Sequence, residues 1–373
     1  MELCPLAKVQ HKISLGQPLP FSIRDGSSKL LLAKNQVVAD DEQLEALLER
    51  GAFVSLDELR GARAEIYNAP PADLPTLWRK LADGVSRVLT SMPSPSAPQA
   101  LDDAARYLGA LTDRAPDIAL YLMVRPDYNE HTRHSVMRSL QAATAGWLLA
   151  GRLGWPTERA LSLVKAAFTM NLGMLDLHER LSHQTKPLST AQRHGLLAHP
   201  MTSVKTLQDS GVDDAEWLEA VALHHEKPAG GGYPGGQPNR SEMAQALRLV
   251  DIFTAKLAAR STRPGLPAGR AIRELLTSEP PSALALALLK EVGPWPPGSL
   301  VSLQSGDTAV VVQRGADAQS PRVAVLANRQ GEPLRDPVQR DALGKDHAIA
   351  GPADPARLRT RPMPERLFAK LHC

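Results

Sequence analysis

The stretch EAVALHHEKPAGGGYPGG, residues 219–236, organises the rest of the chain. It holds two adjacent histidines, His224 and His225, followed by a glutamate and a glycine-rich turn that closes on Gly-Tyr-Pro. Imidazole is the commonest protein ligand for transition metals, and glycine and proline end a helix and let backbone approach a ligand closely. The pattern indicates a metal or ligand site. The alternative is a helix end with an exposed histidine pair and a flexible loop.

The composition is that of a globular protein built from helices. The chain has 373 residues, enough for two or three domains, with 43% hydrophobic and 22% charged residues. Aromatic residues make up only 4%, and alanine and leucine dominate. This composition favours helices packed through aliphatic side chains over a large β-sandwich.

The net charge and the cysteine content indicate which binding partners and which cellular compartment to expect. A formal charge of +3 gives no reason to expect binding to a nucleic-acid polymer. Cys4 and Cys373 are the two cysteines, at opposite ends of the chain, so we expect no disulfide framework and a reducing environment. The N-terminus lacks the apolar core of a signal peptide, and we find no run of about eighteen apolar residues. We therefore expect a soluble, cytoplasmic protein with no membrane segment.

Residues 1–65 predict a small α+β module. Arg-Asp-Gly at 24–26 separates two apolar runs, which is typical of a hairpin. Asp40 or Asp41 is a candidate cap for a short helix that ends at Gly51.

Residues 70–293 predict a helical domain. Apolar residues recur every three to four positions across 74–92, and further helices are expected over 99–116, from 119 and from 156 to about 174. A helix that begins at Ser189 is expected to end near His199, before Pro200.

The first candidate ligands follow the apolar segment that begins at residue 119. Glu130 and His134 are four residues apart and would share one helix face, whereas His131 is rotated away from Glu130. A solvated Glu–His pair near a helix start explains them equally well. Of the four histidines between 178 and 199, we choose His199 as a ligand.

A carboxylate follows the His pair on an apolar helix face. Asp251 lies between Val250 and Ala255, where an acid is costly unless it is paired or bound to a metal. Arg260 and Arg263 follow one and two turns later and could contact phosphate, although exposed helix arginines are common.

The last region, 294–373, predicts a β-rich extension. Ser-Gly-Asp at 305–307 separates two apolar runs as in a hairpin, and 321–327 supplies another strand. The tail from Pro352 is rich in proline and arginine, and we expect it to be solvated and partly ordered; a short helix over Glu365 to Leu371 is the alternative.

The order and spacing of these residues resemble the HD-GYP family over roughly 118–290. The family pattern after the His pair is Glu, Arg, an Asp-Gly step and Gly-Tyr-Pro, and this chain reads HHEKPAGGGYP with the same spacing. The resemblance implies a mainly α, HD-superfamily helical bundle with small β-containing modules at both ends. It also implies two or three metal ions, usually iron or manganese, and hydrolysis of cyclic di-GMP in bacterial signalling.

The chain departs from the family at its defining dyad. Met170-Asn171 stands where the family has His-Asp, Met174 replaces a lysine, and Ala229 replaces the aspartate of the glycine-rich turn. A neutral amide at 171 cannot balance the charge of two cations, and a thioether is a poor ligand for hard ions. Asp176 and His178 are weaker candidates to replace the missing metal ligands.

The resemblance therefore implies a degenerate site with no assigned catalytic residue. The implied metal ligands are Glu130, His134, His199, His224, His225 and Asp251. The implied nucleotide-contacting residues are Lys227, Gly230, Gly232, Tyr233, Pro234, Arg260 and Arg263. Such a site would hold one divalent ion, iron or manganese, or none.

Three hypotheses follow from the sequence. The favoured one is a weak or inactive hydrolase that acts as a binding or regulatory module, with cyclic di-GMP or a related nucleotide and protein partners. The alternative is an active metal-dependent cyclic di-GMP phosphodiesterase with replacement ligands. The third is a scaffold with neither metal nor nucleotide. The sequence leaves the oligomeric state open.

Overall fold

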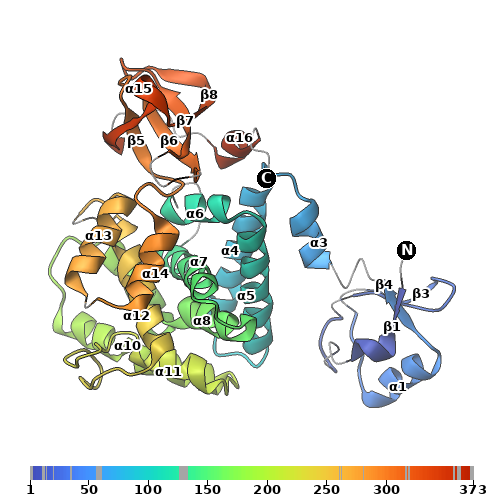
Figure 1. The fold of residues 1–373 in the computed structure, drawn as a ribbon. Coiled ribbons are helices and arrows are strands. Elements are labelled where there is room, and N and C mark those ends of the chain that lie inside the picture. The colour runs from blue at the N-terminus through green and yellow to red at the C-terminus, as the bar shows by residue number, and fades with distance from the viewer. Residues whose placement is uncertain are drawn as a thin grey trace. The chain divides into compact units, whose positions relative to one another are not determined.

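The chain forms two compact units, Met1–Asn68 and Ala69–Cys373. The sequence places the boundary between residues 65 and 70. The computed structural model describes every residue except 1–2, 11–12, 14, 20, 34–35, 56–60, 126–132, 260, 262, 280, 316, 318–319, 356–357, 359–362 and 370–373. A mainly α fold with small β-containing modules at both ends is confirmed (Figure 1).

The first unit is a four-stranded antiparallel sheet with short helices. The strands are β1 (Leu3–Pro5), β2 (Ile23–Arg24), β3 (Leu30–Leu32) and β4 (Phe53–Ser55), in the order β1-β4-β2-β3. The helices are η1 (Leu6–Lys8), α1 (Asp41–Glu49) and α3 (Gly61–Asn68).

Local signals in this unit act as the sequence predicts. The carboxylate of Asp25 accepts from the backbone N–H of Ser27 and of Lys29, which closes the β2–β3 hairpin. Asp40 accepts from the N–H of Gln43 and caps α1. Hairpin and helix enclose a small apolar core around Phe21.

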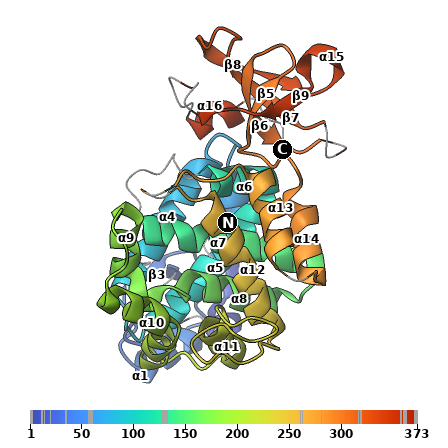
Figure 2. The same cartoon turned by 90° about the vertical axis from the view of Figure 1, so that its left-hand side faces the viewer.

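The second unit is a helical bundle followed by a sheet. Its helices are α4 (Leu74–Thr90), α5 (Ala97–Arg114), α6 (Pro116–Val124), α7 (His134–Leu153), α8 (Thr157–Thr169), η4 (Leu172–Met174), α9 (Leu175–His183), α10 (Thr190–Asp209), α11 (Ala215–Leu223), α12 (Glu242–Leu257), α13 (Ala268–Ser278) and α14 (Ala283–Val292). Helix α7 is the centre: nearly every side chain from Ser135 to Ala150 is buried. Figure 2 shows α9 and α10 on one side of α7 and α13 and α14 on the other.

Two helix ends differ from the prediction. The helix expected up to about 174 stops at Thr169 and continues as the turn η4 and then as α9. Helix α12 ends at Leu257, so Arg263 does not lie on it as expected. Residues Thr157–His183 are long and apolar enough to span a membrane, but 61% of the apolar window is buried inside the bundle, as in a core helix.

The C-terminal sheet packs on the bundle within the same unit. Strands β5 (Leu300–Leu303), β6 (Thr308–Gln313), β7 (Arg322–Ala327), β8 (Pro333–Asp341) and β9 (Ile349–Pro352) are antiparallel in the order β8-β7-β6-β5-β9, with α15 (Gly344–His347) and α16 (Pro364–Phe368) beside them. Arg314 bonds Asp117 of α6 at 2.5 Å and Glu291 of α14 at 2.9 Å. These pairs tie the sheet to α6 and α14 of the helical bundle.

Candidate metal centre

His199 is positioned by a proline inside its own helix. Helix α10 continues through Pro200, so the prediction that it ends there is wrong. Proline has no N–H, and Pro200 therefore leaves the carbonyl of Leu196 without its usual helical donor. The Nδ1 of His199 lies 2.6 Å from that oxygen and donates to it. This bond fixes the tautomer and leaves a lone pair on Nε2.

His224 is held in the same way at the end of α11. Its Nδ1 lies 2.7 Å from the carbonyl of Val221, and the residue is only 1% exposed. Its Nε2 then also carries a lone pair, and it faces the Nε2 of His199 at 3.2 Å. The interpretation of an exposed histidine pair is therefore wrong for His224.

Two facing lone pairs require a positive charge between them. Burial, and then the nearby His224, lowers the pKa of His199 to about 3. Burial also lowers the pKa of His224. Protons are therefore disfavoured at neutral pH, and a divalent cation is the group that suits this pair.

His225 completes a cluster of three imidazoles. One ligand atom from each of His199, His224 and His225 lies within 4.8 Å of the others. Burial, followed by the other two histidines, lowers the pKa of His225. The ring of Tyr233 stacks on His225 with centroids 4.4 Å apart, and burial raises the pKa of the Tyr233 phenol. Three neutral, convergent imidazoles fit a divalent transition-metal ion.

The glycine-rich turn is fixed against the cluster by Glu226. The Oε1 of this buried carboxylate accepts from the N–H of Gly235 at 2.5 Å and from that of Gly236 at 2.9 Å. A Cβ at Gly232 would lie 2.3 Å from the carbonyl oxygen of His225, so no side chain fits there. Hydrogen bonds to Glu226 therefore hold the glycine-rich turn in a conformation in which the Tyr233 ring stacks on His225.

Asp251 is paired with an arginine. Its Oδ1 accepts from the Nη2 of Arg138 at 2.7 Å, and the two side chains are 16% and 3% exposed. The expectation that an acid on this apolar face must be paired or metal-bound is met by the arginine. Arg248, one turn earlier on α12, pairs with Glu279 at 2.7 Å.

The other candidate ligands lie apart from the three histidines or outside the described residues. His134 begins α7 and contacts the ring edge of His178, with centroids 5.3 Å apart. Asp176 is 80% exposed and bonds Arg133 at 2.5 Å. Glu130 and His131 fall among the residues that the structure does not describe.

The altered turn at 170–174 lies against α10 close to His199. Met170 is fully buried and Asn171 is 3% exposed. A Cβ at Gly173 would lie 2.7 Å from the carbonyl oxygen of His199. The hydroxyl of Ser203 accepts from the N–H of Gly173 at 2.8 Å and lies 3.1 Å from the Met170 carbonyl. These bonds join the backbone of the turn to Ser203 on α10 and do not involve the side chains at 170, 171 and 174.

The structure describes all but one of the residues predicted to contact nucleotide. Lys227 and Pro234, in the glycine-rich segment after the histidine pair, are exposed, and Gly230 has a positive φ of 85°. Arg263 lies beyond α12 and donates to the carbonyl of Ala255 at 2.7 Å, and Arg260 is outside the described residues.

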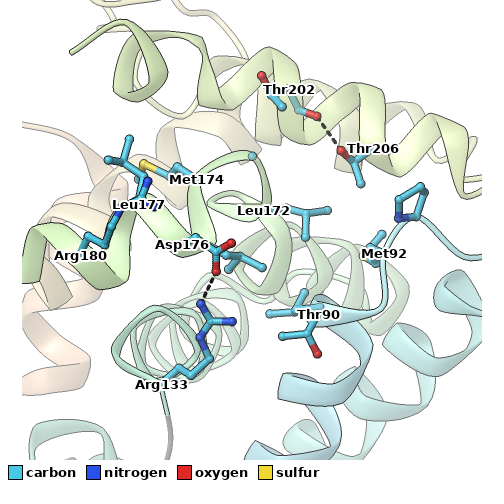
Figure 3. A pocket seen from close by; sticks show the side chains of 14 residues that line it. Thr90, Met92, Arg133, Leu172, Met174, Asp176, Leu177, Arg180, Thr202 and Thr206 are labelled. Carbon is cyan, nitrogen blue, oxygen red and sulfur yellow. Dashed lines mark hydrogen bonds and ion pairs between the residues drawn. The ribbon is translucent and has the colours of Figure 1, made fainter. Parts of the chain in front are cut away.

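A pocket of about 510 Å³ adjoins the altered turn. Figure 3 shows Met174 among its lining residues, with Arg133, Arg180 and Thr202. The three histidines do not line it. Two arginines therefore border the same pocket as the methionine that replaces the family's cation.

Sequence reasoning did not find Arg138, Ser203 or the role of Glu226. Arg138 had a signal, because it is the one Asp, Glu, Lys or Arg between His134 and Arg152 on a helix rich in alanine. Ser203 had none, since its partners are backbone groups 30 and 33 residues away.

Comparison with known proteins agrees with the site. Residues 125–279 match the family model described as HD domain, which together with the histidine cluster defines an HD-superfamily domain. The curated "Cyclic di-GMP phosphodiesterase PA4108" of Pseudomonas aeruginosa is 27% identical over 229 residues, 60% of this chain and 55% of that protein. The chain thus spans about half the length of that relative.

A solved structure is similar as well. "Bd1817, a HDG"Y"P protein from Bdellovibrio bacteriovorus" has 15% identity and a TM-score of 0.49, over 78% of this chain and 98% of that one. The chain therefore carries an HD domain over residues 125–279.

Proposed function

We propose that this chain acts in bacterial cyclic di-GMP signalling, with an HD-GYP domain that binds one divalent ion and nucleotide but hydrolyses nucleotide weakly or not at all. One observation carries the proposal: His199, His224 and His225 converge beside a turn that holds Met170-Asn171. The centre thus keeps its imidazoles and lacks an acid at 171.

The three histidines would hold iron or manganese. A divalent ion there would polarise a phosphoryl oxygen and lower the pKa of water. The chain's part is to keep the imidazoles neutral through burial and to aim two Nε2 atoms at one point through the bonds of Nδ1 to Leu196 and Val221.

Asn171 argues against efficient hydrolysis. Two neighbouring cations need a carboxylate between them, because their mutual repulsion must be offset. The amide of Asn171 is neutral and offers one weak oxygen ligand, and the Met170 thioether cannot replace an imidazole on a hard ion.

The pocket beside the turn supports retained nucleotide binding. Its volume of about 510 Å³ falls in the usual range for small-molecule sites, roughly 300–1,000 Å³. Arg180 supplies positive charge at its wall, Arg133 lies there as an ion pair with Asp176, and Thr202 supplies a hydroxyl. These groups suit phosphate and ribose oxygens.

An active phosphodiesterase is the second candidate. The contact of His178 with His134 gives a second pair of imidazoles, which could serve as replacement ligands. This alternative predicts at least two ions per chain and release of linear pGpG or GMP from cyclic di-GMP.

Hydrolysis assays separate the two candidates. Protein purified without oxygen and supplied with Mn²⁺ or Fe²⁺ is incubated with cyclic di-GMP, beside the Met170→His/Asn171→Asp variant, with His199→Ala as the negative control. We expect the double variant to exceed the unmodified protein by about a hundredfold, the lower end of the range attributed to one catalytic group. An unmodified protein that matches or exceeds the double variant contradicts the proposal.

A further inference from the structure

Arg138 and Asp251 form a buried ion pair beside the histidine cluster. The Nη2 of Arg138 lies 2.7 Å from Oδ1 of Asp251 and 3.1 Å from its backbone oxygen. These bonds join α7 to α12, and the arginine side chain is almost completely buried. A buried guanidinium is kept where a carboxylate matches its charge.

The charged side chains next to this pair on α12 are also matched by a partner of opposite charge. Arg248 lies one helical turn before Asp251 on α12, and its charge is matched by Glu279, 2.7 Å away. The described charged groups on α7 and α12 around the cluster thus form two neutral pairs, and Asp251 is already neutralised without a metal.

A cation coordinated by Asp251 would have to displace the guanidinium. His134 precedes Arg138 by one helical turn, on the same face of α7. An ion placed between Asp251 and His134 would therefore meet the Arg138 charge at short range in a site of low dielectric.

We propose that Arg138 is a built-in counter-cation that withholds Asp251 from metal and restricts the centre to one divalent ion at His199, His224 and His225. This inference rests on the proposed function, because it assumes that the three histidines bind an ion. Arg138 acts through Asp251 and is a positioning residue.

The test counts ions in charge-deleted variants of the full chain. Arg138→Met removes the charge while keeping an unbranched side chain, and Arg138→Met/Asp251→Asn removes both charges. Arg152→Met is the matched control, because Arg152 also lies on α7 and pairs with a carboxylate, that of Glu291. Each protein is loaded with Mn²⁺ without oxygen, freed of excess metal and measured by elemental analysis and calorimetric titration.

The expected counts are one ion per chain in the unmodified protein and the control, two in Arg138→Met, and one in the double variant. A folded Arg138→Met protein that still binds one ion overturns the proposal. If that variant does not fold, the double variant decides, since loss of its ion would show that Asp251 is a ligand. A count of zero in the unmodified protein contradicts the proposed function itself.

Discussion

Replacing Ser203 with alanine tests what holds the altered turn against α10. The buried hydroxyl of Ser203 is the acceptor for the N–H of Gly173 at 2.8 Å, and it also lies near the carbonyls of Met170 and His199. Alanine removes one oxygen, so little volume is lost, but a buried N–H loses its acceptor. Such a loss costs about 1–3 kcal/mol, and we expect the free energy of unfolding to fall by that amount.

Urea unfolding followed by tryptophan fluorescence measures this change in the relevant unit. The five tryptophans all lie in the second unit, at 78, 147, 155, 217 and 295. Thr202→Ala is the matched control, because Thr202 is exposed and its hydroxyl bonds only the carbonyl of Ala198 in its own helix among the bonds described for it. We expect the control to change stability by less than about 0.5 kcal/mol. Equal stability of the two variants would refute the account of the turn.

Three further predictions concern the histidines, the glycine-rich turn and the pocket. Burial lowers the pKa of His199 to about 3, so below pH 6.5 this residue is protonated in the unfolded chain and neutral in the folded chain. The free energy of unfolding of the metal-free protein should therefore fall by about 1.4 kcal/mol per pH unit because of this residue as the pH is lowered. Urea titrations from pH 7.5 to 5.0 should show a shallower slope in His199→Gln, and an unchanged slope would count against the buried neutral imidazole. Gly232→Ala should displace the glycine-rich turn, because the added Cβ would lie 2.3 Å from the His225 carbonyl oxygen. The displaced turn should weaken Mn²⁺ binding measured by calorimetry, and an unchanged affinity would show that the turn does not support the metal centre. Arg180→Ala should weaken cyclic di-GMP binding by about 10- to 150-fold, which corresponds to the roughly 1.5–3 kcal/mol of a bond to a charged group. Arg193→Ala, exposed on α10 outside the pocket lining, should leave the affinity unchanged; equal affinities of the two variants would remove the pocket from the ligand site.

Much of the fold follows from local signals in the sequence. The Asp25 turn and the Asp40 cap each depend on bonds within four residues, and such bonds can be recognised without knowledge of the rest of the chain. Two of the three convergent histidines also carry a local signal, because His224 and His225 are adjacent and precede a helix-breaking turn.

Some of the features that sequence reasoning missed depend on long-range contacts. Arg138 and Asp251 are 113 residues apart, and only the packing of α7 on α12 brings them together. The course of α10 through Pro200 depends on a compensating bond from His199 to a carbonyl, which a rule about proline alone does not include. That bond is local, from residue 199 to residue 196 of the same helix, so the proline rule fails here because a neighbouring side chain satisfies the freed carbonyl.

Elemental analysis of the unmodified protein, purified without oxygen and freed of loosely bound metal, tests the central claim most directly. Three convergent neutral imidazoles beside an amide at 171 predict one iron or manganese ion per chain. Two or more tightly bound ions per chain would contradict a single-ion centre.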